Sequence, residues 1–298
     1  MNRRTFLAAG AALSAGAQTA DIPIIDTHIH LFDTNRPGGV PWPPKNDAVL
    51  YKAALPARYR AIAVPLGIHG AIEVEASPLL EDNQWVLDIA ARDRILVGTV
   101  GNLEPGKPEF ARQLERFHRN PLFLGIRYGN LWGRDFAGES ARPEFVAGLK
   151  LLAGAGLSLD TANPTPELIA TVLRITDKVP GLRVIIDHLP QLDPRQYDLR
   201  ALGQRPQIYV KISEVLRRVG GRIPRDVAFY RPRLDELFDA FGEDRVLYGS
   251  DWPNSDQWEP YEVELKLVRE YFLAKGRPVA EKYFHRNSQA AYRWKERG

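Results

Sequence analysis

The segment Val184-Ile185-Ile186-Asp187-His188 has the pattern that decides the fold. Its first three residues are apolar without alternation, as expected for a parallel strand that is covered on both faces. Val246-Leu247 shows the same pattern near the C-terminus. Outward from these two segments, short β-branched runs alternate with helical stretches along almost the whole chain. The sequence therefore predicts a parallel α/β protein.

Eight strands are predicted, and 298 residues are enough for a complete eight-fold barrel. Several helical stretches begin at or just after a proline, which suits a first helical turn. We expect an α/β fold of one domain, a (β/α)8 TIM barrel, with an open doubly wound sheet as the alternative. The predicted strands lie near residues 22–29, 70–75, 94–101, 122–128, 157–161, 182–188, 207–213 and 245–250. The predicted helices lie near residues 56–65, 83–91, 108–118, 143–155, 166–178 and 234–241, with a last one at 279–294 beneath or beside the barrel.

The first 17 residues have the features of an export signal. Arg3 and Arg4 precede a short apolar run, and Ala15-Gly16-Ala17 is a small-x-small cleavage pattern. The arginine pair stands where a twin-arginine signal has it. We therefore expect a twin-arginine signal peptide at residues 1–17, a barrel at residues 18–298, and a periplasmic or secreted protein. An unprocessed amphipathic N-terminus is the alternative.

The charge and cysteine counts exclude several classes of function. The chain has no cysteine, so neither disulfides nor thiolate metal sites are available. Its net charge is +3, but removing Arg3 and Arg4 from the 40 basic residues leaves 38 against 37 acidic ones. Blocks of like charge are absent, which disfavours nucleic-acid binding. We expect a small-molecule substrate, no nucleic-acid partner and no membrane association after processing, and oligomerisation stays open.

Histidines and an aspartate follow three predicted strands. The first strand ends Asp26-Thr27-His28-Ile29-His30, and alternation along a strand puts Asp26, His28 and His30 on one face, with Ile29 opposite. His188 ends the sixth strand and Asp251 follows the eighth. Barrel enzymes keep their chemistry at the carboxyl ends of the strands, so we expect these groups to meet there.

These motifs resemble a known family. Asp-Thr-His-Ile-His at 26–30, Ile-Asp-His-Leu-Pro at 186–190 and Tyr-Gly-Ser-Asp-Trp-Pro at 248–253 are similar to motifs of the amidohydrolase superfamily. More narrowly, the chain resembles its lactonase-like branch, which includes 2-pyrone-4,6-dicarboxylate lactonase and L-fuconolactonase. The resemblance implies that His28, His30 and His188 polarise a carbonyl, directly or through a metal, while Asp251 activates water.

The expected cofactor is one divalent metal ion, with Zn²⁺ favoured. His28, His30 and Asp251 would hold it, with His188 near. Binuclear members of the superfamily carry a lysine or glutamate ligand on or near the fourth strand, and Phe123-Leu124-Gly125-Ile126-Arg127 has none. A two-metal centre is therefore not expected. A metal-independent mechanism stays open, because lactonase-like relatives without metal exist.

Further residues are candidates for substrate binding. We expect Arg127, Lys211 and Arg217 to hold a substrate carboxylate, and Trp252 to line the site. Glu214 stands where the family pattern often has a glycine after Lys-x-Ser, which puts substrate contacts carried over from relatives in doubt there. Glu75 and Asp160 could each serve the site or pair with a basic residue inside the barrel; the sequence does not decide.

The predicted function is that of a hydrolase that opens a small lactone, for example one derived from a sugar acid. A decarboxylase on the same scaffold is the first alternative. The second is a non-catalytic periplasmic barrel that binds a small ligand, but such a module has no need of a water-activating Asp251.

Overall fold

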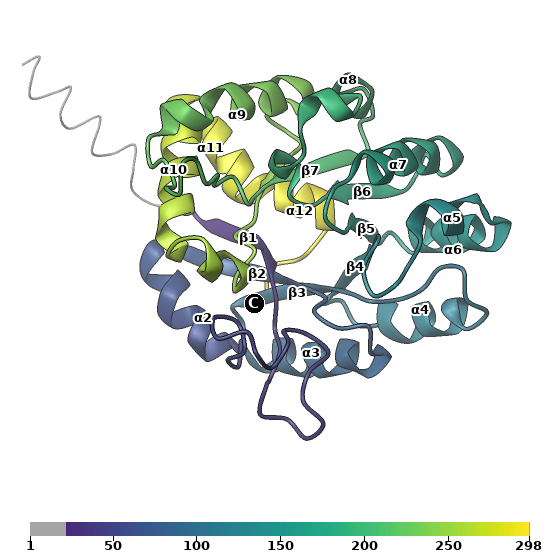
Figure 1. The fold of residues 1–298 in the computed structure, drawn as a ribbon. Coiled ribbons are helices and arrows are strands. Elements are labelled where there is room, and N and C mark those ends of the chain that lie inside the picture. Colours follow the sequence, from purple (N-terminus) through teal and green to yellow (C-terminus); the bar gives the residue numbers. More distant parts are fainter. Residues whose placement is uncertain (1–21, 298) are drawn as a thin grey trace, which may run out of the picture.

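The computed structural model describes residues 22–297 and confirms the predicted barrel (Figure 1). Its eight strands are parallel and neighbour one another in chain order. Backbone hydrogen bonds join the segment that follows the last strand to the first strand, since Asp251 N donates to His28 O at 2.9 Å and His30 N donates to Trp252 O at 2.7 Å. The strands are β1 (Ile24–Ile29), β2 (Ile68–Val74), β3 (Leu96–Gly101), β4 (Phe123–Tyr128), β5 (Ser158–Thr161), β6 (Arg183–Ile186), β7 (Ile208–Ile212) and β8 (Val246–Tyr248).

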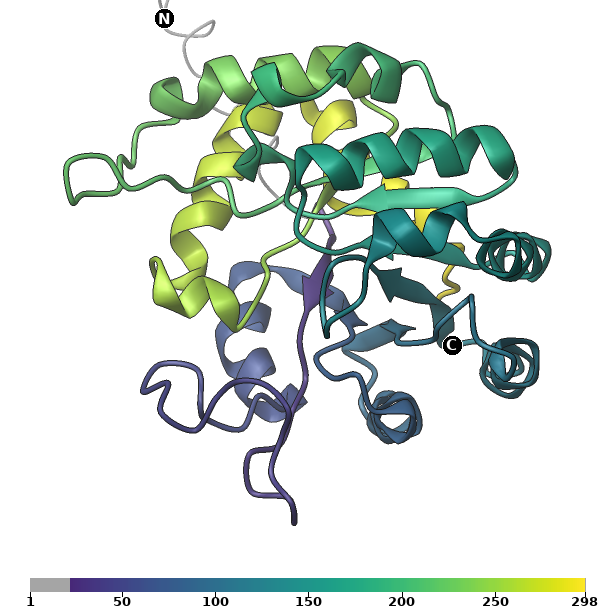
Figure 2. The same ribbon diagram turned by 45° about the vertical axis from the view of Figure 1, so that its right-hand side comes forward.

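Helices surround the strands, as Figures 1 and 2 show. Pro56, Pro143 and Pro166 stand in the first turns of their helices, where a missing N–H leaves no hydrogen bond unmade. Thr165 caps the last of these, and its hydroxyl accepts the Leu168 N–H at 3.1 Å. The α-helices are α2 (Pro56–Ala63), α3 (Leu80–Arg92), α4 (Phe110–His118), α5 (Phe136–Ala141), α6 (Pro143–Gly154), α7 (Pro166–Lys178), α8 (Leu199–Gly203), α9 (Val227–Phe241), α10 (Tyr261–Ala274), α11 (Arg277–Glu281) and α12 (Asn287–Tyr292).

The C-terminal third differs from the sequence prediction in detail. α9 begins seven residues before the predicted start, because Asp226 caps it and the helix accommodates Pro232 in its interior. α10 is a helix that was not predicted, even though Pro260, a residue typical of helix starts, directly precedes it. The predicted last helix is divided into α11, a π-helical turn at Lys282–Arg286, and α12.

The last helix closes the bottom of the barrel, as predicted. Tyr292 and Trp294 join an apolar cluster with Ile25, Ile185 and Leu247 from the strands. The Tyr292 hydroxyl donates to Asp160 Oδ2 at 2.5 Å. Access to the barrel interior is therefore left to the opposite end, where the strands have their carboxyl ends.

The predicted facing of Asp26 is wrong. Between the pairs Asp26–Ala71 and Ile29–Glu73, β1 advances three residues while β2 advances two, so β1 contains a bulge. The extra residue breaks the alternation, and Asp26 points outward while His28 points inward. The Asp26 carboxylate accepts hydrogen bonds from the hydroxyls of Tyr59 on α2 (2.9 Å) and Tyr261 on α10 (2.8 Å). Asp26 therefore anchors α2 and α10 to β1.

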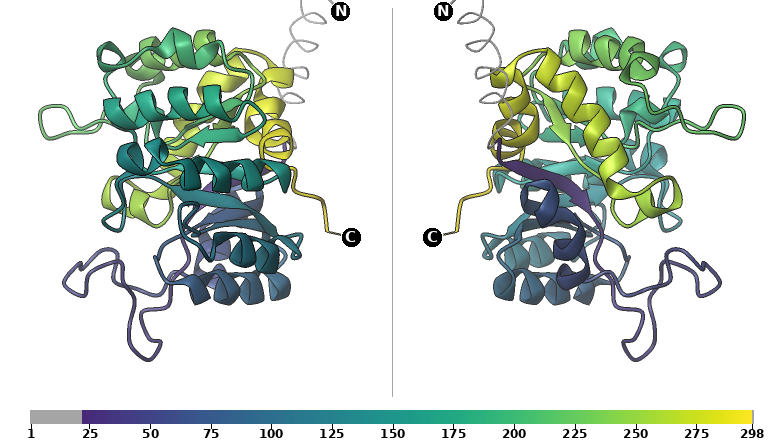
Figure 3. Two further views of the ribbon diagram at one scale, coloured as in Figure 1. Left: turned by 90° about the vertical axis from the view of Figure 1, so that its right-hand side faces the viewer. Right: turned by 90° about the vertical axis from the view of Figure 1, so that its left-hand side faces the viewer.

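Two long loops follow the carboxyl ends of strands. One joins β1 to α2, and the other contains residues 219–226 after β7. Both extend on the same side of the molecule, away from the C-terminal residues (Figure 3). No helix between residues 22 and 297 is both long and apolar enough to cross a lipid bilayer. The predicted signal at residues 1–17 lies outside the described residues.

Candidate active site

The carboxyl ends of β1, β6, β7 and β8 meet at one place. His188, Glu214 and Asp251 each follow a strand closely and have positive backbone φ angles of 52°, 50° and 57°. Non-glycine residues adopt this left-handed conformation at a cost, and such residues cluster at functional sites. Three of them at the same end of the barrel indicate that this end carries the chemistry.

Three imidazoles converge on one carboxylate oxygen. Asp251 Oδ1 lies 3.1 Å from His30 Nε2, 3.5 Å from His28 Nε2 and 3.7 Å from His188 Nε2. All four side chains are buried, with at most 4% of any of them exposed. The structure thus brings together the four residues that the sequence predicted for the centre.

Hydrogen bonds orient two of the imidazoles. His30 Nδ1 lies 2.7 Å from Val74 O, a carbonyl that can only accept, so Nδ1 carries the proton and Nε2 is left with its lone pair. His188 Nδ1 lies 2.8 Å from Ser213 Oγ. His28 Nδ1 lies between an ammonium donor, Lys211 Nζ at 3.2 Å, and the Asp187 carboxylate at 3.6 Å.

Burial keeps the imidazoles neutral and the carboxylate less acidic than usual. It lowers the pKa of His28 well below the ordinary value and that of His30 to about 4, and it also lowers the pKa of His188. The same burial raises the pKa of Asp251 to about 6. Neutral imidazoles are the form that binds metal ions.

The donor atoms fit a divalent cation. His28 Nε2 and Asp251 Oδ2 are buried without a hydrogen-bond partner among the described residues, and His30 Nε2 faces Asp251 Oδ1 lone pair to lone pair. His28, His30 and Asp251 can offer ligand atoms that all lie within 4.8 Å of one another. Imidazole nitrogens with a carboxylate oxygen form a donor set suited to Zn²⁺.

A cavity of about 400 Å³ lies over these groups. This volume is in the range of small-molecule sites. Two indoles, Trp42 from the loop after β1 and Trp132 from the loop after β4, stand among its walls. Its lining residues are His30, Trp42, Ala76, Arg127, Leu131, Trp132, Asn163, His188, Asp251 and Asn254.

Of the four residues predicted to bind substrate, Arg127 lines this cavity and three do not. Lys211 is fully buried below it, where its ammonium contacts Asp160 at 2.7 Å and Asp187 at 2.9 Å. Trp252 is also fully buried, with its ring 5.2 Å from that of Tyr59. The Arg217 guanidinium donates to backbone carbonyls of its own loop and of Pro190. Strand position does not tell whether a residue such as Lys211 reaches the mouth of the barrel, because inward-pointing side chains also fill the barrel below its mouth. Trp252 instead packs against Tyr59 of α2, and Arg217 is held by its own loop.

Glu214 joins the site, although the sequence left its role open. Its carboxylate forms a second possible ligand group with His188 and Asp251. Burial raises the pKa of Glu214 to about 7. Asn163 and Asn254 were missed as cavity residues, and the signal that could have found them is their position two and six residues after strand ends.

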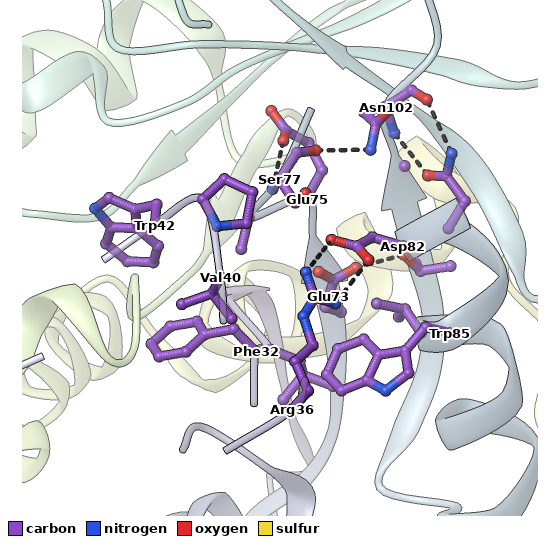
Figure 4. Close-up of a pocket in the computed structure, with 17 residues that line it drawn as sticks. Phe32, Arg36, Val40, Trp42, Glu73, Glu75, Ser77, Asp82, Trp85 and Asn102 are labelled. Carbon is purple, nitrogen blue, oxygen red and sulfur yellow. Dashed lines mark hydrogen bonds and ion pairs between the residues drawn. The ribbon is translucent and has the colours of Figure 1, made fainter. Parts of the chain in front are cut away.

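A second, much smaller hollow of about 20 Å³ lies between the loop after β1 and α3 (Figure 4). Arg36 crosses it and forms two hydrogen bonds with Asp82, at 2.7 and 3.0 Å. Its guanidinium also lies 5.8 Å from the ring of Trp85. The hollow has room for about one water molecule, so these contacts fasten the loop to α3.

A (β/α)8 barrel with three histidines and an aspartate at the carboxyl ends of its strands has the architecture of a barrel enzyme. A model of the Amidohydrolase family matches residues 25–294. The chain belongs to this family, and it is a hydrolase of the amidohydrolase type.

The chain is also similar to named proteins. L-fucono-1,5-lactonase of Burkholderia ambifaria is 25% identical over 240 residues, which cover 78% of this chain and 80% of the relative. An amidohydrolase of Burkholderia multivorans with bound zinc has a TM-score of 0.79 at 19% identity, covering 91% and 99% of the two chains. A putative 2-pyrone-4,6-dicarboxylic acid hydrolase of Pseudomonas putida has a TM-score of 0.74 at 20% identity, covering 91% and 98%. The two solved structures establish a shared fold.

Proposed function

We propose that this protein hydrolyses a small lactone, for example one derived from a sugar acid, with water that Asp251 activates. The observation that carries the proposal is the convergence of three neutral imidazoles on Asp251 at a cavity of about 400 Å³. A relative that is named a lactonase and another that is named a pyrone hydrolase support a lactone as the substrate class.

Asp251 acts as the general base. Its Oδ2 is free of hydrogen bonds from the described residues, so it can accept a proton from an attacking water. The same carboxyl then returns the proton to the ring oxygen that leaves when the lactone opens. An imidazole that carries a proton on Nε2 can polarise the carbonyl directly, and all three imidazoles can do so through a bound ion. Trp42 and Trp132 offer flat walls for a ring.

The test is acid release, because opening a lactone produces a carboxylic acid. Purified protein should acidify a weakly buffered solution of an aldonolactone, which a pH indicator reports, and the released acid should match the lactone consumed. If a panel of aldonolactones releases no acid above the uncatalysed rate, while aromatic acids release carbon dioxide, the decarboxylase alternative replaces this proposal.

The proposed cofactor is one divalent ion, with Zn²⁺ favoured, held by His28, His30 and Asp251 with His188 near. The ligand geometry fits it, and a relative of the same fold contains zinc. When bound, such an ion lowers the pKa of water and polarises the carbonyl.

Metal removal gives a direct prediction. Dialysis against a chelator should reduce lactone hydrolysis, and one equivalent of Zn²⁺ or Mn²⁺ per chain should restore it, because the buried Nε2 atoms lose their cation. Metal content by mass spectrometry should rise in parallel with activity. Full activity in protein with no measurable metal would favour the mechanism in which the imidazoles bind the carbonyl themselves.

We also propose a periplasmic or secreted location, with a small molecule as the partner and neither nucleic acid nor membrane. Arg3, Arg4 and the pattern Ala15-Gly16-Ala17 support export through a twin-arginine route. Replacing both arginines with lysine should leave the precursor inside the cell, as fractionation and immunoblotting would show. Export of the double variant at the parental level would contradict this route.

A further inference from the structure

Glu75 forms hydrogen bonds with two residues of one cavity wall but does not line the cavity itself. It follows β2, and its carboxylate accepts hydrogen bonds from Arg127 Nε at 3.1 Å and from Trp132 Nε1 at 3.2 and 3.0 Å. The backbone N–H of Ser77 donates to Oε2 at 3.2 Å. Only 4% of Glu75 is exposed, whereas Arg127 and Trp132 both face the cavity. One buried carboxylate therefore fixes two cavity residues from different positions in the chain.

The ion pair changes what the cavity can bind. Arg127 is the one lysine or arginine among the residues that line the cavity, and its side chain is 7% exposed. Glu75 neutralises its charge at close range in a region of low dielectric, where charges interact strongly. Asp251 adds negative charge on the same cavity. Away from the proposed metal ligands, a substrate carboxylate would thus find no uncompensated side-chain cation on these walls.

An uncharged substrate finds suitable partners there. Arg127 Nη2 donates to Glu75 O at 2.8 Å, and Nη1 has no hydrogen bond to any residue between 22 and 297. Nη1 can donate to a hydroxyl or ring oxygen. The side-chain amides of Asn163 and Asn254 add neutral donors and acceptors.

We propose that Glu75 is a positioning residue that holds Arg127 and Trp132 and selects uncharged lactones over lactones that carry an additional carboxylate. The selection among lactones rests on the proposed lactone hydrolysis. The positioning of the two side chains is independent of that proposal. The sequence allowed either a role at the site or a structural ion pair for Glu75, and in the structure its ion pair with Arg127 serves the site.

The first test compares two lactones that differ in one charge. D-galactono-1,4-lactone is uncharged, and D-galactaro-1,4-lactone carries a carboxylate at the far end. The wild type should prefer the former in kcat/KM. Glu75→Gln keeps the size and removes the charge, so the ratio of the two kcat/KM values should shift at least tenfold toward the charged lactone. A merely structural role would lower both values alike, and an unchanged ratio would overturn the proposal.

The second test measures binding and needs no hydrolysis. Benzoate and benzamide have the same shape and differ in charge, and calorimetry or tryptophan fluorescence reports their affinities. Glu75→Gln should bind benzoate at least tenfold more tightly than the wild type does, with benzamide changed less than about twofold. If the wild type opens no lactone but this shift appears, the proposed function fails while Glu75 keeps its role. If benzoate affinity does not rise, the proposal for Glu75 is wrong.

The chain offers a matched control two residues away. Glu73 is buried like Glu75, but its carboxyl accepts from Thr99 Oγ1 at 2.5 Å and lies at the small hollow beside Arg36 and Asp82 (Figure 4). Burial raises the pKa of Glu73 to about 8, so this group is mainly uncharged at pH 7. Glu73→Gln therefore changes little charge at that pH, and both the lactone ratio and the benzoate affinity should stay close to wild-type values.

Discussion

Replacing Asp251 with asparagine should lower kcat for lactone hydrolysis by about 10²–10⁴-fold, the usual loss when one positioned general base is removed. Asparagine keeps the size and one acceptor oxygen of the side chain but cannot take a proton from water. KM should change much less than kcat, because the proton moves only in the transition state. Steady-state kinetics with the acid-release assay measures both constants.

Three features of Asp251 make the base assignment specific. The backbone at Asp251 has a φ of 57°, and its N–H donates to His28 O. Three imidazole Nε2 atoms lie within 3.7 Å of its carboxylate. Burial raises its pKa to about 6, which is closer to the working pH of a base than that of an exposed aspartate. Asp251 is therefore fixed in place and able to bind a proton reversibly.

Asp256→Asn is the matched control. Asp256 lies in the turn after Asp251 and is partly exposed. It forms an ion pair of 2.6 Å with Arg58, and it does not line the cavity. Its substitution should leave kcat within about twofold, since a partly exposed ion pair contributes little. If Asp251→Asn, folded by circular dichroism, also stays within a few-fold of wild type, Asp251 is a structural anchor and the mechanism fails.

The sequence predicted the barrel well because its signals are local. Unalternating apolar runs mark parallel strands, prolines mark helix starts, and ionisable residues at strand ends mark the site. His28, His30, His188 and Asp251 were predicted in this way, and in the structure the three histidine Nε2 atoms lie within 3.7 Å of Asp251 Oδ1. Each of these inferences needs only a strand end and the few residues next to it.

The parts that the sequence did not predict depend on depth and register. A bulge in β1 turned Asp26 outward, and no feature of the sequence marks an extra residue in a strand pair. Lys211 was expected at the substrate, but the same inward face continues below the cavity, where Asp160 and Asp187 meet it. Whether an inward side chain reaches the mouth or the core depends on barrel tilt and stagger, which become visible in three dimensions.

Lys211→Met should lower the free energy of unfolding by about 3–5 kcal/mol, as expected when one partner of a buried ion pair is removed. Lys211, Asp160 and Asp187 are each fully buried, and the ammonium lies 2.7 and 2.9 Å from the two carboxylates. Methionine fills a similar volume but leaves two buried acids without a cation. Denaturant unfolding at pH 7 measures the loss, and Lys275→Met is the control.

The control separates burial from pairing. Lys275 lies 2.8 Å from Asp235, the same kind of contact, but these side chains are 28% and 38% exposed. Its loss should cost about 1 kcal/mol or less, because water screens and solvates the remaining carboxylate. If both lysine variants lose equal stability, the core cluster does not behave as a buried ion pair.

The pH dependence of the Lys211→Met loss gives a further check with a definite sign. Burial already raises the pKa of Asp160 to about 6 in the wild type, and without the lysine the folded-state pKa of this acid should rise further. When the pKa of an acid is higher in the folded state than in the unfolded state, protonation of that acid stabilises the folded protein. This contribution to the free energy of unfolding is fully present below the unfolded pKa of about 4 and is lost as pH rises through the folded pKa. The destabilisation by Lys211→Met should therefore be smaller at pH 5 than at pH 8. Adding Asp160→Asn to the variant removes one stranded charge and should recover part of the stability at pH 8, whereas a loss that is independent of pH and of this second substitution would point to packing instead of charge.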